Sequence, residues 1–276
     1  HRFVEYRQVF KKLYKQLKDL KPDAIYIGGD VVHGKLDTSP EEVRMVANFF
    51  LELCKIAPTI IIPGNHDCNL NNKSREDTLS PIVDLVKKIT PDLHYWKKTG
   101  VYTMDNVDFA HLSIFDIDKE GKQRTDTLPS PDNHTEQIKI ALFHGGVDKH
   151  FYDNGFQVQD DRVTNDTFAG YDIVMLGDIH KRQFLNEEET IAYPGSLIQQ
   201  NYSEDPSHGF LLWDLDKKKA TYHQVENEYG YKILQVVDGV IQNKMNFIPP
   251  KGSIKIKYTN TTLEQIKDIQ MDIRKQ

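Results

Sequence analysis

Residues 58–69, PTIIIPGNHDCN, decide the fold prediction. Four β-favouring residues, 59–62, run into a Pro-Gly pair, which ends a strand and turns the chain. An amide, an imidazole and a carboxylate follow at once, as Asn65, His66 and Asp67. In α/β proteins, the carboxyl ends of strands open onto ligand-binding crevices. The stretch therefore predicts a buried strand that carries functional side chains at its carboxyl end.

Helices and strands alternate on both sides of this stretch. Apolar residues recur at helical intervals up to residue 20, and Pro22 ends the pattern, so an amphipathic helix is predicted there. A second helix is predicted from Ser39 as N-cap, with Pro40 at its first position. The alternation predicts a layered α/β domain. Further strands are expected near residues 24–30, 93–96, 101–104, 107–114, 138–143 and 172–176, and a helix near 76–89.

The second half of the chain has a different pattern. Four segments, 191–196, 209–216, 219–226 and 231–237, read as consecutive strands without helices between them, which predicts a second sheet packed on the first. From about residue 228, two strands and a polar helix from Thr262 follow. We therefore expect one domain over residues 1–227 and the start of a smaller domain over residues 228–276.

Composition limits the class of protein. The chain has 276 residues, of which 38% are hydrophobic and 28% charged, as in ordinary globular proteins. It has no apolar run near the roughly 20 residues that span a bilayer, and no signal-like amino terminus, so we expect an intracellular protein of the cytoplasm, nucleoid or nucleus without membrane contact. Two cysteines cannot form a disulfide framework, which favours a reducing compartment. The net charge of −6 argues against coating nucleic acid by charge, but it does not exclude a nucleic-acid enzyme that binds divalent cations.

Four polar clusters each follow an apolar strand. Because the carboxyl ends of strands in a layered fold share one edge, these side chains can converge. Carboxylate, amide and imidazole ligands suit Mn²⁺, Mg²⁺, Fe²⁺ or Zn²⁺, and the lack of cysteine ligands argues against a structural zinc site. Each cluster alone also has a structural reading, as a turn or a buried core histidine, but four in series favour a metal centre. The clusters contain Asp30 and His33; Asn65, His66 and Asp67; His144; and Asp178 and His180.

The motifs GGDVVH, PGNHD, FHGG, GDIH and YPGS resemble those of the calcineurin-like metallophosphoesterase superfamily, over roughly residues 1–227. Within it, the sequence is most similar to SbcD-type DNA double-strand-break repair nucleases, including phage and viral subunits. That narrower likeness rests on GGDVVH, on GNHD where protein phosphatases carry GNHE, and on AYPGSLIQQNYSED with HGFLLWDL. The resemblance implies a layered α-β-β-α sandwich followed by the start of a small α+β capping domain.

The resemblance also implies roles for the site residues. Asp30 would bridge two metal ions, and Asn65, His144 and Asp178 would complete one metal site. His180 would serve the other. The expected metal is Mn²⁺, with Mg²⁺ as the alternative. The two ions would together activate a water in line with a phosphodiester.

Catalytic roles follow from the same resemblance. His66 would protonate the leaving oxygen or stabilise the transition state, and Asp67 would orient its ring. His33 would lie behind the ligands or face DNA, and Tyr193 would shape the floor near the metals. For His33 and Tyr193 a purely structural role stays open.

Two features depart from the family pattern. Asp178 stands where many relatives have the first histidine of Gly-His-x-His, which makes the site more anionic and favours Mn²⁺ or Mg²⁺. In addition, the family begins with a strand that carries Asp-x-His, and no such motif precedes the first helix here. We expect an upstream segment of roughly 15–25 residues that supplies it, the reach of one strand and a loop.

The resemblance implies a metal-dependent DNA exonuclease and endonuclease, active in DNA repair and recombination as a homodimer. It would work beside an SbcC-type, SMC-like ATPase, which must be a separate chain because the sequence has no G-x-x-x-x-G-K-[ST] loop. One alternative is a phosphodiesterase or phosphatase that acts on small nucleotides or proteins. Another is a catalytically silent scaffold that binds DNA ends.

Overall fold

The computed structural model describes residues 2–34, 37–72, 74–133, 138–159, 162–243 and 249–275. The α-helices are α1 (Phe3–Leu20), α2 (Pro40–Cys54), α3 (Leu79–Lys87) and α4 (Leu263–Lys275). The strands are β1 (Ile25–Ile27), β2 (Thr59–Ile61), β3 (Leu93–Tyr95), β4 (Gly100–Met104), β5 (Val107–Leu112), β6 (Ile138–His144), β7 (Ile173–Gly177), β8 (Gln183–Phe184), β9 (Ile191–Tyr193), β10 (Gly209–Asp214), β11 (Lys219–Gln224), β12 (Tyr229–Val237), β13 (Val240–Ile241) and β14 (Lys251–Thr259).

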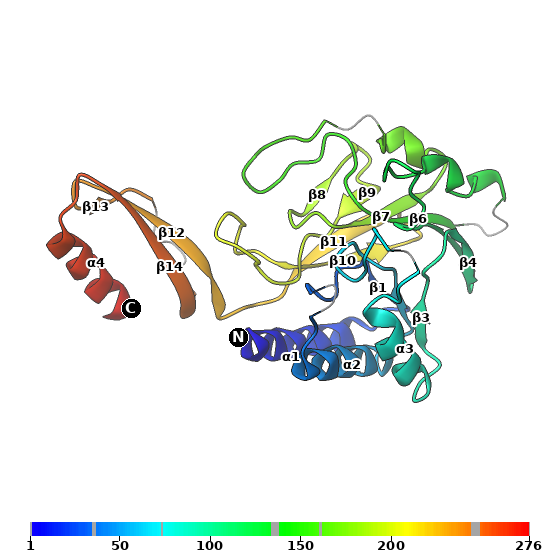
Figure 1. Cartoon of the computed structure of the whole chain (residues 1–276), viewed down its shortest axis with the longest axis horizontal. Helices are drawn as coiled ribbons and strands as arrows, with labels where there is room; N and C mark the ends of the chain where they lie inside the picture. The colour runs from blue at the N-terminus through cyan, green and yellow to red at the C-terminus, as the bar shows by residue number, and fades with distance from the viewer. Residues whose placement is uncertain are drawn as a thin grey trace.

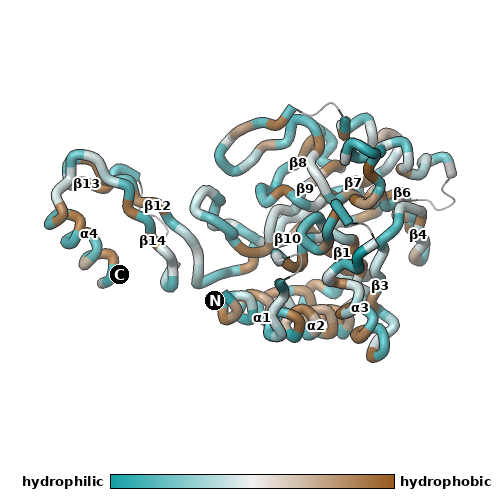
Figure 2. The backbone as a smooth tube through the Cα atoms, in the orientation of Figure 1, coloured by the Kyte–Doolittle hydropathy of each residue, from teal (hydrophilic) through white to brown (hydrophobic). Residues whose placement is uncertain are grey.

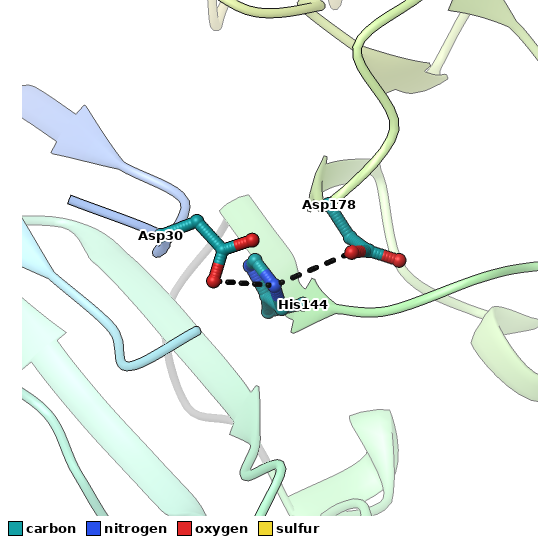
Figure 3. A group of neighbouring side chains, drawn as sticks. All are labelled: Asp30, His144 and Asp178. Carbon is teal, nitrogen blue, oxygen red and sulfur yellow. Dashed lines mark ion pairs between the residues drawn. The ribbon is translucent and has the colours of Figure 1, made fainter. Parts of the chain in front are cut away.

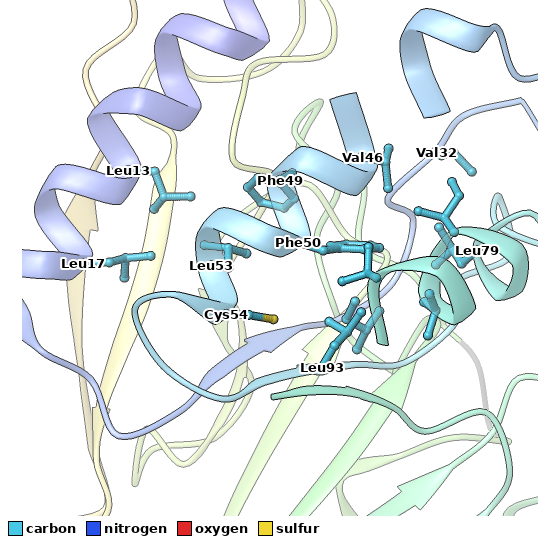
Figure 4. Packing of buried hydrophobic residues seen from close by; sticks show 14 of the residues in the cluster. Leu13, Leu17, Val32, Val46, Phe49, Phe50, Leu53, Cys54, Leu79 and Leu93 are labelled. Carbon is cyan, nitrogen blue, oxygen red and sulfur yellow. The ribbon is translucent and has the colours of Figure 1, made fainter. Parts of the chain in front are cut away.

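Helices α1, α2 and α3 cover one face of a small parallel sheet with the order β1-β2-β3 (Figure 1). Helix α2 begins as predicted, since the Ser39 hydroxyl accepts a hydrogen bond from the Glu42 amide at 3.2 Å. Figure 4 shows Leu13 and Leu17 of α1 directed at Phe49 and Leu53 of α2, while Phe50 points to the other side, toward Leu79 of α3. This core fixes the position of β1 and β2, whose carboxyl ends carry two of the polar clusters.

A larger sheet has the order β4-β5-β6-β7-β9-β8. Strands β5, β6, β7 and β9 run parallel, with antiparallel neighbours at both edges. A second core lies between the two sheets, where Ile60 and Ile62 meet Phe109, Ile140 and Ile173. The layered α/β fold class is thus confirmed.

The resemblance implied a layer of helices on the outer face of the larger sheet, but a different kind of structure covers that face. Phe143 and Tyr193 pack there against Val163 and Phe168, and the described residues of this cover form loops and 3-10 turns such as Asn165–Phe168. The expected second sheet of four consecutive strands is also wrong in its membership. Strand β9 joins the larger sheet, β10 and β11 pair only with each other, and β12 pairs with β13 and β14. An alternating pattern shows that a segment is a strand, but not which neighbour it pairs with.

The residues after 228 extend away from the layered part, beyond the amino-terminal end of α1 (Figure 1). Strands β12 and β14 run parallel over nine paired residues, and α4 buries Ile266 beside this sheet. Helix α4 alternates between hydrophilic and hydrophobic residues along its length (Figure 2). That this tail begins a separate domain stays a prediction. Among the described residues, the helices are all too short or too polar to cross a bilayer.

Candidate metal centre

Three ligand groups from distant parts of the chain meet at the carboxyl ends of the strands. Asp30 follows β1, His144 ends β6, and Asp178 follows β7, and their ligand atoms all lie within 4.8 Å of one another. The His144 Nε2 atom lies 3.4 Å from Asp30 Oδ1 and 3.7 Å from Asp178 Oδ1 (Figure 3). This is the convergence that the motif order implied.

The tautomer of His144 follows from its other nitrogen. Nδ1 lies 2.5 Å from the carbonyl oxygen of Gly28, which can only accept, so Nδ1 must carry the proton. The lone pair of the neutral ring is therefore on Nε2, the atom that faces the two carboxylates. A histidine ligand held through its second nitrogen in this way is the usual arrangement in metalloproteins. Its ring is 1% exposed, so it cannot swing away.

Asn65 adds an oxygen to the same point. Its Oδ1 lies 3.1 Å from His144 Nε2, and this position is 3.2 Å from both carboxylate oxygens of Asp30. With the amide oxygen in this position, four acceptor atoms face each other and repel one another unless a cation lies between them or His144 Nε2 carries a proton. Turning the amide would instead place its nitrogen there, as a donor to Asp30 and His144. Asp30, His144 and Asp178 offer a donor set that suits a divalent ion, and Asn65 could add its oxygen when the amide is oriented toward them.

The backbone at the two aspartates is strained. Asp30 has φ 54° and Asp178 has φ 92°, conformations that side-chain-bearing residues rarely adopt. Such strain costs about 1–3 kcal/mol per residue and is concentrated at functional sites. A side chain at Gly64 would overlap Asp30 and lie 2.7 Å from His144 Cε1, and one at Gly177 would overlap the Gly28 carbonyl. Glycine at these positions lets the ends of the two sheets approach closely.

The charges of the site favour a bound cation. Burial alone would lower the pKa of His144, but the carboxylate of Asp30, with Asp178, raises it to about 9. Burial tends to raise the pKa of Asp30, yet His144 and the His66 amide outweigh it, and the pKa is lowered. Burial and the charge of Asp30 raise the pKa of Asp178. A proton on His144 partly neutralises the carboxylates, and a metal ion would replace that proton.

The structure corrects the role expected for Asp67. Its carboxylate does not orient the His66 ring; its oxygens accept backbone hydrogen bonds from Asp30 and Gly64, both at 2.8 Å, and from Val32 at 3.0 Å. The side chain is fully buried, and burial raises its pKa to about 7 although the Val32 and Gly64 amides oppose this. Asp67 thus fixes the loop after β1 onto the loop after β2. A strand-end carboxylate looks the same in sequence whether it meets a ring or backbone amides.

His66 and His33 form a stacked pair beside the acceptor cluster. Their ring centroids are 4.8 Å apart with an interplanar angle of 17°, and His66 Nδ1 lies 3.2 Å from the His33 carbonyl oxygen. The His33 carbonyl thus orients the His66 ring, which was the role expected of Asp67. The Nε2 atom of His66 lies at the opposite edge of the ring. His33 is exposed and His66 half-buried, so both can reach a substrate.

Tyr193 has a structural place. Its hydroxyl donates to the carbonyl of Gly145 at 2.6 Å and accepts from the amide of Val147 at 3.0 Å, and the residue is fully buried. Tyr193 therefore supports the loop that follows His144 through these two hydrogen bonds.

His180 lies apart from the acceptor cluster and has its own partner. Its Nδ1 lies 2.9 Å from Oε1 of Glu204, whose side chain is 0% exposed, while the His180 side chain is 44% exposed. This hydrogen bond raises the pKa of His180, against the effect of burial. No pattern in the sequence pointed to Glu204, although it lies in the stretch AYPGSLIQQNYSED that carries part of the family resemblance. A carboxylate in a loop has no characteristic sequence spacing from the residue it contacts, so the sequence does not reveal its partner.

Comparisons with known proteins agree with this geometry. Residues 2–184 match the family described as calcineurin-like phosphoesterase. The chain is 41% identical over 285 residues to "Uncharacterized protein R555" of Acanthamoeba polyphaga mimivirus, a match that covers 100% of this chain and 20% of that protein. It is 24% identical over 240 residues to "Putative phosphoesterase 244L" of Invertebrate iridescent virus 6, covering 86% of this chain and 75% of that protein. The chain thus spans about one fifth of the length of the mimivirus relative.

Solved structures share the fold. The protein TT1561 of Thermus thermophilus matches with a TM-score of 0.50 and 16% identity, over 80% of this chain and 95% of that chain. A second solved structure matches with a TM-score of 0.57 and 11% identity over the same shares. At these identities the likeness speaks for the fold, and the family match carries the assignment. The chain belongs to the calcineurin-like phosphoesterases, a family of metal-dependent phosphoester hydrolases.

Proposed function

We propose that the chain is a DNA nuclease of the SbcD type, which hydrolyses phosphodiester bonds with two divalent cations. The observation that carries the metal chemistry is the meeting of acceptor atoms from Asp30, Asn65, His144 and Asp178. Three of these groups offer oxygen, which favours Mn²⁺ or Mg²⁺ over softer ions. The relative named a phosphoesterase in an iridescent virus supports the reaction class.

Divalent cations, when bound, supply Lewis acidity and lower the pKa of water. Asp30, Asn65, His144 and Asp178 would hold one ion. Asp30 and His180 would contribute to holding the other. The chain's own work is to arrange charge: the buried His144 and the strained aspartates keep the ligands in place before substrate arrives, so little reorganisation is needed.

In this proposal, the leaving oxygen takes its proton from His66. Its Nδ1 faces the His33 carbonyl at 3.2 Å and keeps its proton there, so the ring would give up the proton of Nε2 from its doubly protonated form and return to the neutral Nδ1–H tautomer. The stacked ring of His33 restricts the rotation of His66 and is itself exposed. An extended DNA strand offers a phosphodiester to this edge, whereas protein phosphatases act on monoesters.

The choice of DNA rests on the motif resemblance, and substrate competition tests it. The purified chain with Mn²⁺ is incubated with labelled linear double-stranded DNA, bis(p-nitrophenyl) phosphate and a cyclic nucleotide. We expect DNA cleavage that chelator abolishes and Mn²⁺ restores. Turnover of the small substrates with intact DNA would assign the chain to the small-molecule phosphodiesterases. DNA-end binding without turnover of any substrate would favour the silent scaffold.

The partners belong to the same proposal. We infer a homodimer that works with an SMC-like ATPase, with the tail after residue 228 as part of a capping domain. Light scattering of the chain measures the dimer. Co-purification with the ATPase encoded in the same genome tests the complex.

A further inference from the structure

A buried carboxylate lies directly behind His180. Glu204 Oε1 is 2.9 Å from His180 Nδ1, although the two residues are 24 positions apart and belong to different loops. The carboxylate side chain is 0% exposed, whereas the ring in front of it is 44% exposed. The pair therefore combines an anchored acceptor with a ring whose other edge faces outward.

The environment of Glu204 is built to hold its carboxylate in place. Oε2 accepts a hydrogen bond from the Gln200 amide at 2.6 Å, and Oε1 accepts one from the Asn201 side chain at 2.6 Å. The Nε2 atom of buried His208 lies 3.6 Å from Oε2. A buried carboxylate is tolerated when donors surround it in this way. Its position is therefore defined before any ligand binds.

The loop that carries Glu204 is itself fastened to β12. The buried side chain of Gln199 donates to the carbonyls of Glu204, at 2.9 Å, and of Tyr231, at 3.0 Å. The Tyr231 amide donates back to Gln199 Oε1 at 2.7 Å. One amide thus occupies both backbone groups of a strand residue. This contact restricts the motion of the loop, and a residue that positions another side chain needs such a rigid support.

We propose that Glu204 is the positioning residue of His180: it holds the proton on Nδ1 and the lone pair on Nε2, so that the outward edge of the ring is ready to bind a divalent cation. The inference deepens the proposed function, on which the metal part rests. Carboxylates that accept from the second nitrogen of a metal-binding histidine fix its tautomer and orientation and raise its basicity. His180 lies two residues after Asp178, in the loop that follows β7.

The first experiment needs neither metal nor activity. Long-range ¹H–¹⁵N NMR spectra of the metal-free chain, recorded at a pH where His180 is neutral, identify which ring nitrogen carries the proton. We expect the Nδ1–H tautomer in the wild type and in Asn201→Ala, which removes a neighbouring donor but keeps the carboxylate. In Glu204→Ala we expect the Nε2–H tautomer to become populated. An Nε2–H tautomer in the wild type overturns the proposal, even if Glu204→Ala does not fold.

The second experiment measures metal binding. Isothermal titration with Mn²⁺ should show about a 10–100-fold loss of affinity at the weaker site in Glu204→Ala, with the tighter site unchanged. Glu204→Gln keeps an oxygen acceptor for Nδ1–H and should recover part of that affinity. Wild-type affinity in a folded Glu204→Ala overturns the metal part. A wild type that binds no second ion contradicts the two-metal function instead, and the tautomer result stands apart from it.

Discussion

The candidate metal centre has a buried side and a solvent side, and they are built in different ways. On the buried side, His144 comes from a strand, is 1% exposed and donates to a backbone carbonyl, while glycines surround it. On the solvent side, His180 comes from a loop, is 44% exposed and donates to a side-chain carboxylate. The buried side cannot be changed without changing the fold. The solvent side can vary while the fold persists, so substitutions should separate stability from activity.

The largest expected effect belongs to the solvent side. His66→Ala removes the candidate proton donor but no core contact, because the residue is half-buried and its ring stacks on that of exposed His33. We expect DNA cleavage to fall by about 10²–10⁴-fold, the usual contribution of a general acid. The free energy of unfolding should change by less than about 0.5 kcal/mol. Cleavage within tenfold of the wild type would remove His66 from the catalytic groups.

Gly64→Ala tests the buried side. An added methyl group would overlap Asp30 and crowd His144, so the loops after β1 and β2 must separate. We expect a loss of about 1–3 kcal/mol in unfolding free energy, together with loss of Mn²⁺ binding. Gly100→Ala is the matched control, because a methyl group there meets only the Tyr102 ring at 3.9 Å. If both variants unfold at the same denaturant concentration as the wild type, the close approach at Gly64 is not required.

Asp67→Asn preserves shape but changes hydrogen bonding. The carboxylate accepts from three backbone amides, and a carboxamide would turn an NH₂ group toward at least one of them. A buried donor left without an acceptor costs about 1–3 kcal/mol, and thermal unfolding measures it. Asp84→Asn on the exposed face of α3 serves as the control. Equal melting temperatures for the two variants would contradict the fastening role of Asp67.

The smallest effect is the pH dependence of metal binding. With a pKa of about 9, His144 is protonated below that pH in the metal-free chain, and an ion must displace this proton. The apparent Mn²⁺ affinity should therefore rise with pH, by about tenfold per unit for one proton released, and level off above about pH 9. Titration calorimetry between about pH 6.5 and about pH 8.5, in buffers of different ionisation enthalpy, counts the protons. An affinity that does not change over this range would mean that His144 is not a ligand.

The sequence predicted the parts of the fold that local patterns define. Strand ends marked by glycine and followed by Asp30, Asn65, His144 and Asp178 indicated the edge at which the side chains meet, since parallel strands share their carboxyl ends. Pairing partners were out of reach, as β9 shows: its pattern is that of a strand in any sheet, and only packing against β7 decides the outcome.

Interactions with the backbone were also hidden from the sequence. The role of Asp67 depends on amides of the loop after a neighbouring strand, and the contact of Glu204 with His180 exists only because two loops meet. Neither contact follows from spacing along the chain. The side chains that could bind a metal are therefore easier to predict from sequence than the residues that hold those side chains in position.

The contact between Gln199 and Tyr231 has a mechanical consequence. A hinge at the start of β12 would be the natural place for the tail to swing, but the amide closes that hinge by occupying both backbone groups of Tyr231. Any rotation of the tail must break these bonds or pull the Glu204 loop along with it. A force on β14, which pairs with β12, would therefore be transmitted through the Glu204 loop to the ring of His180.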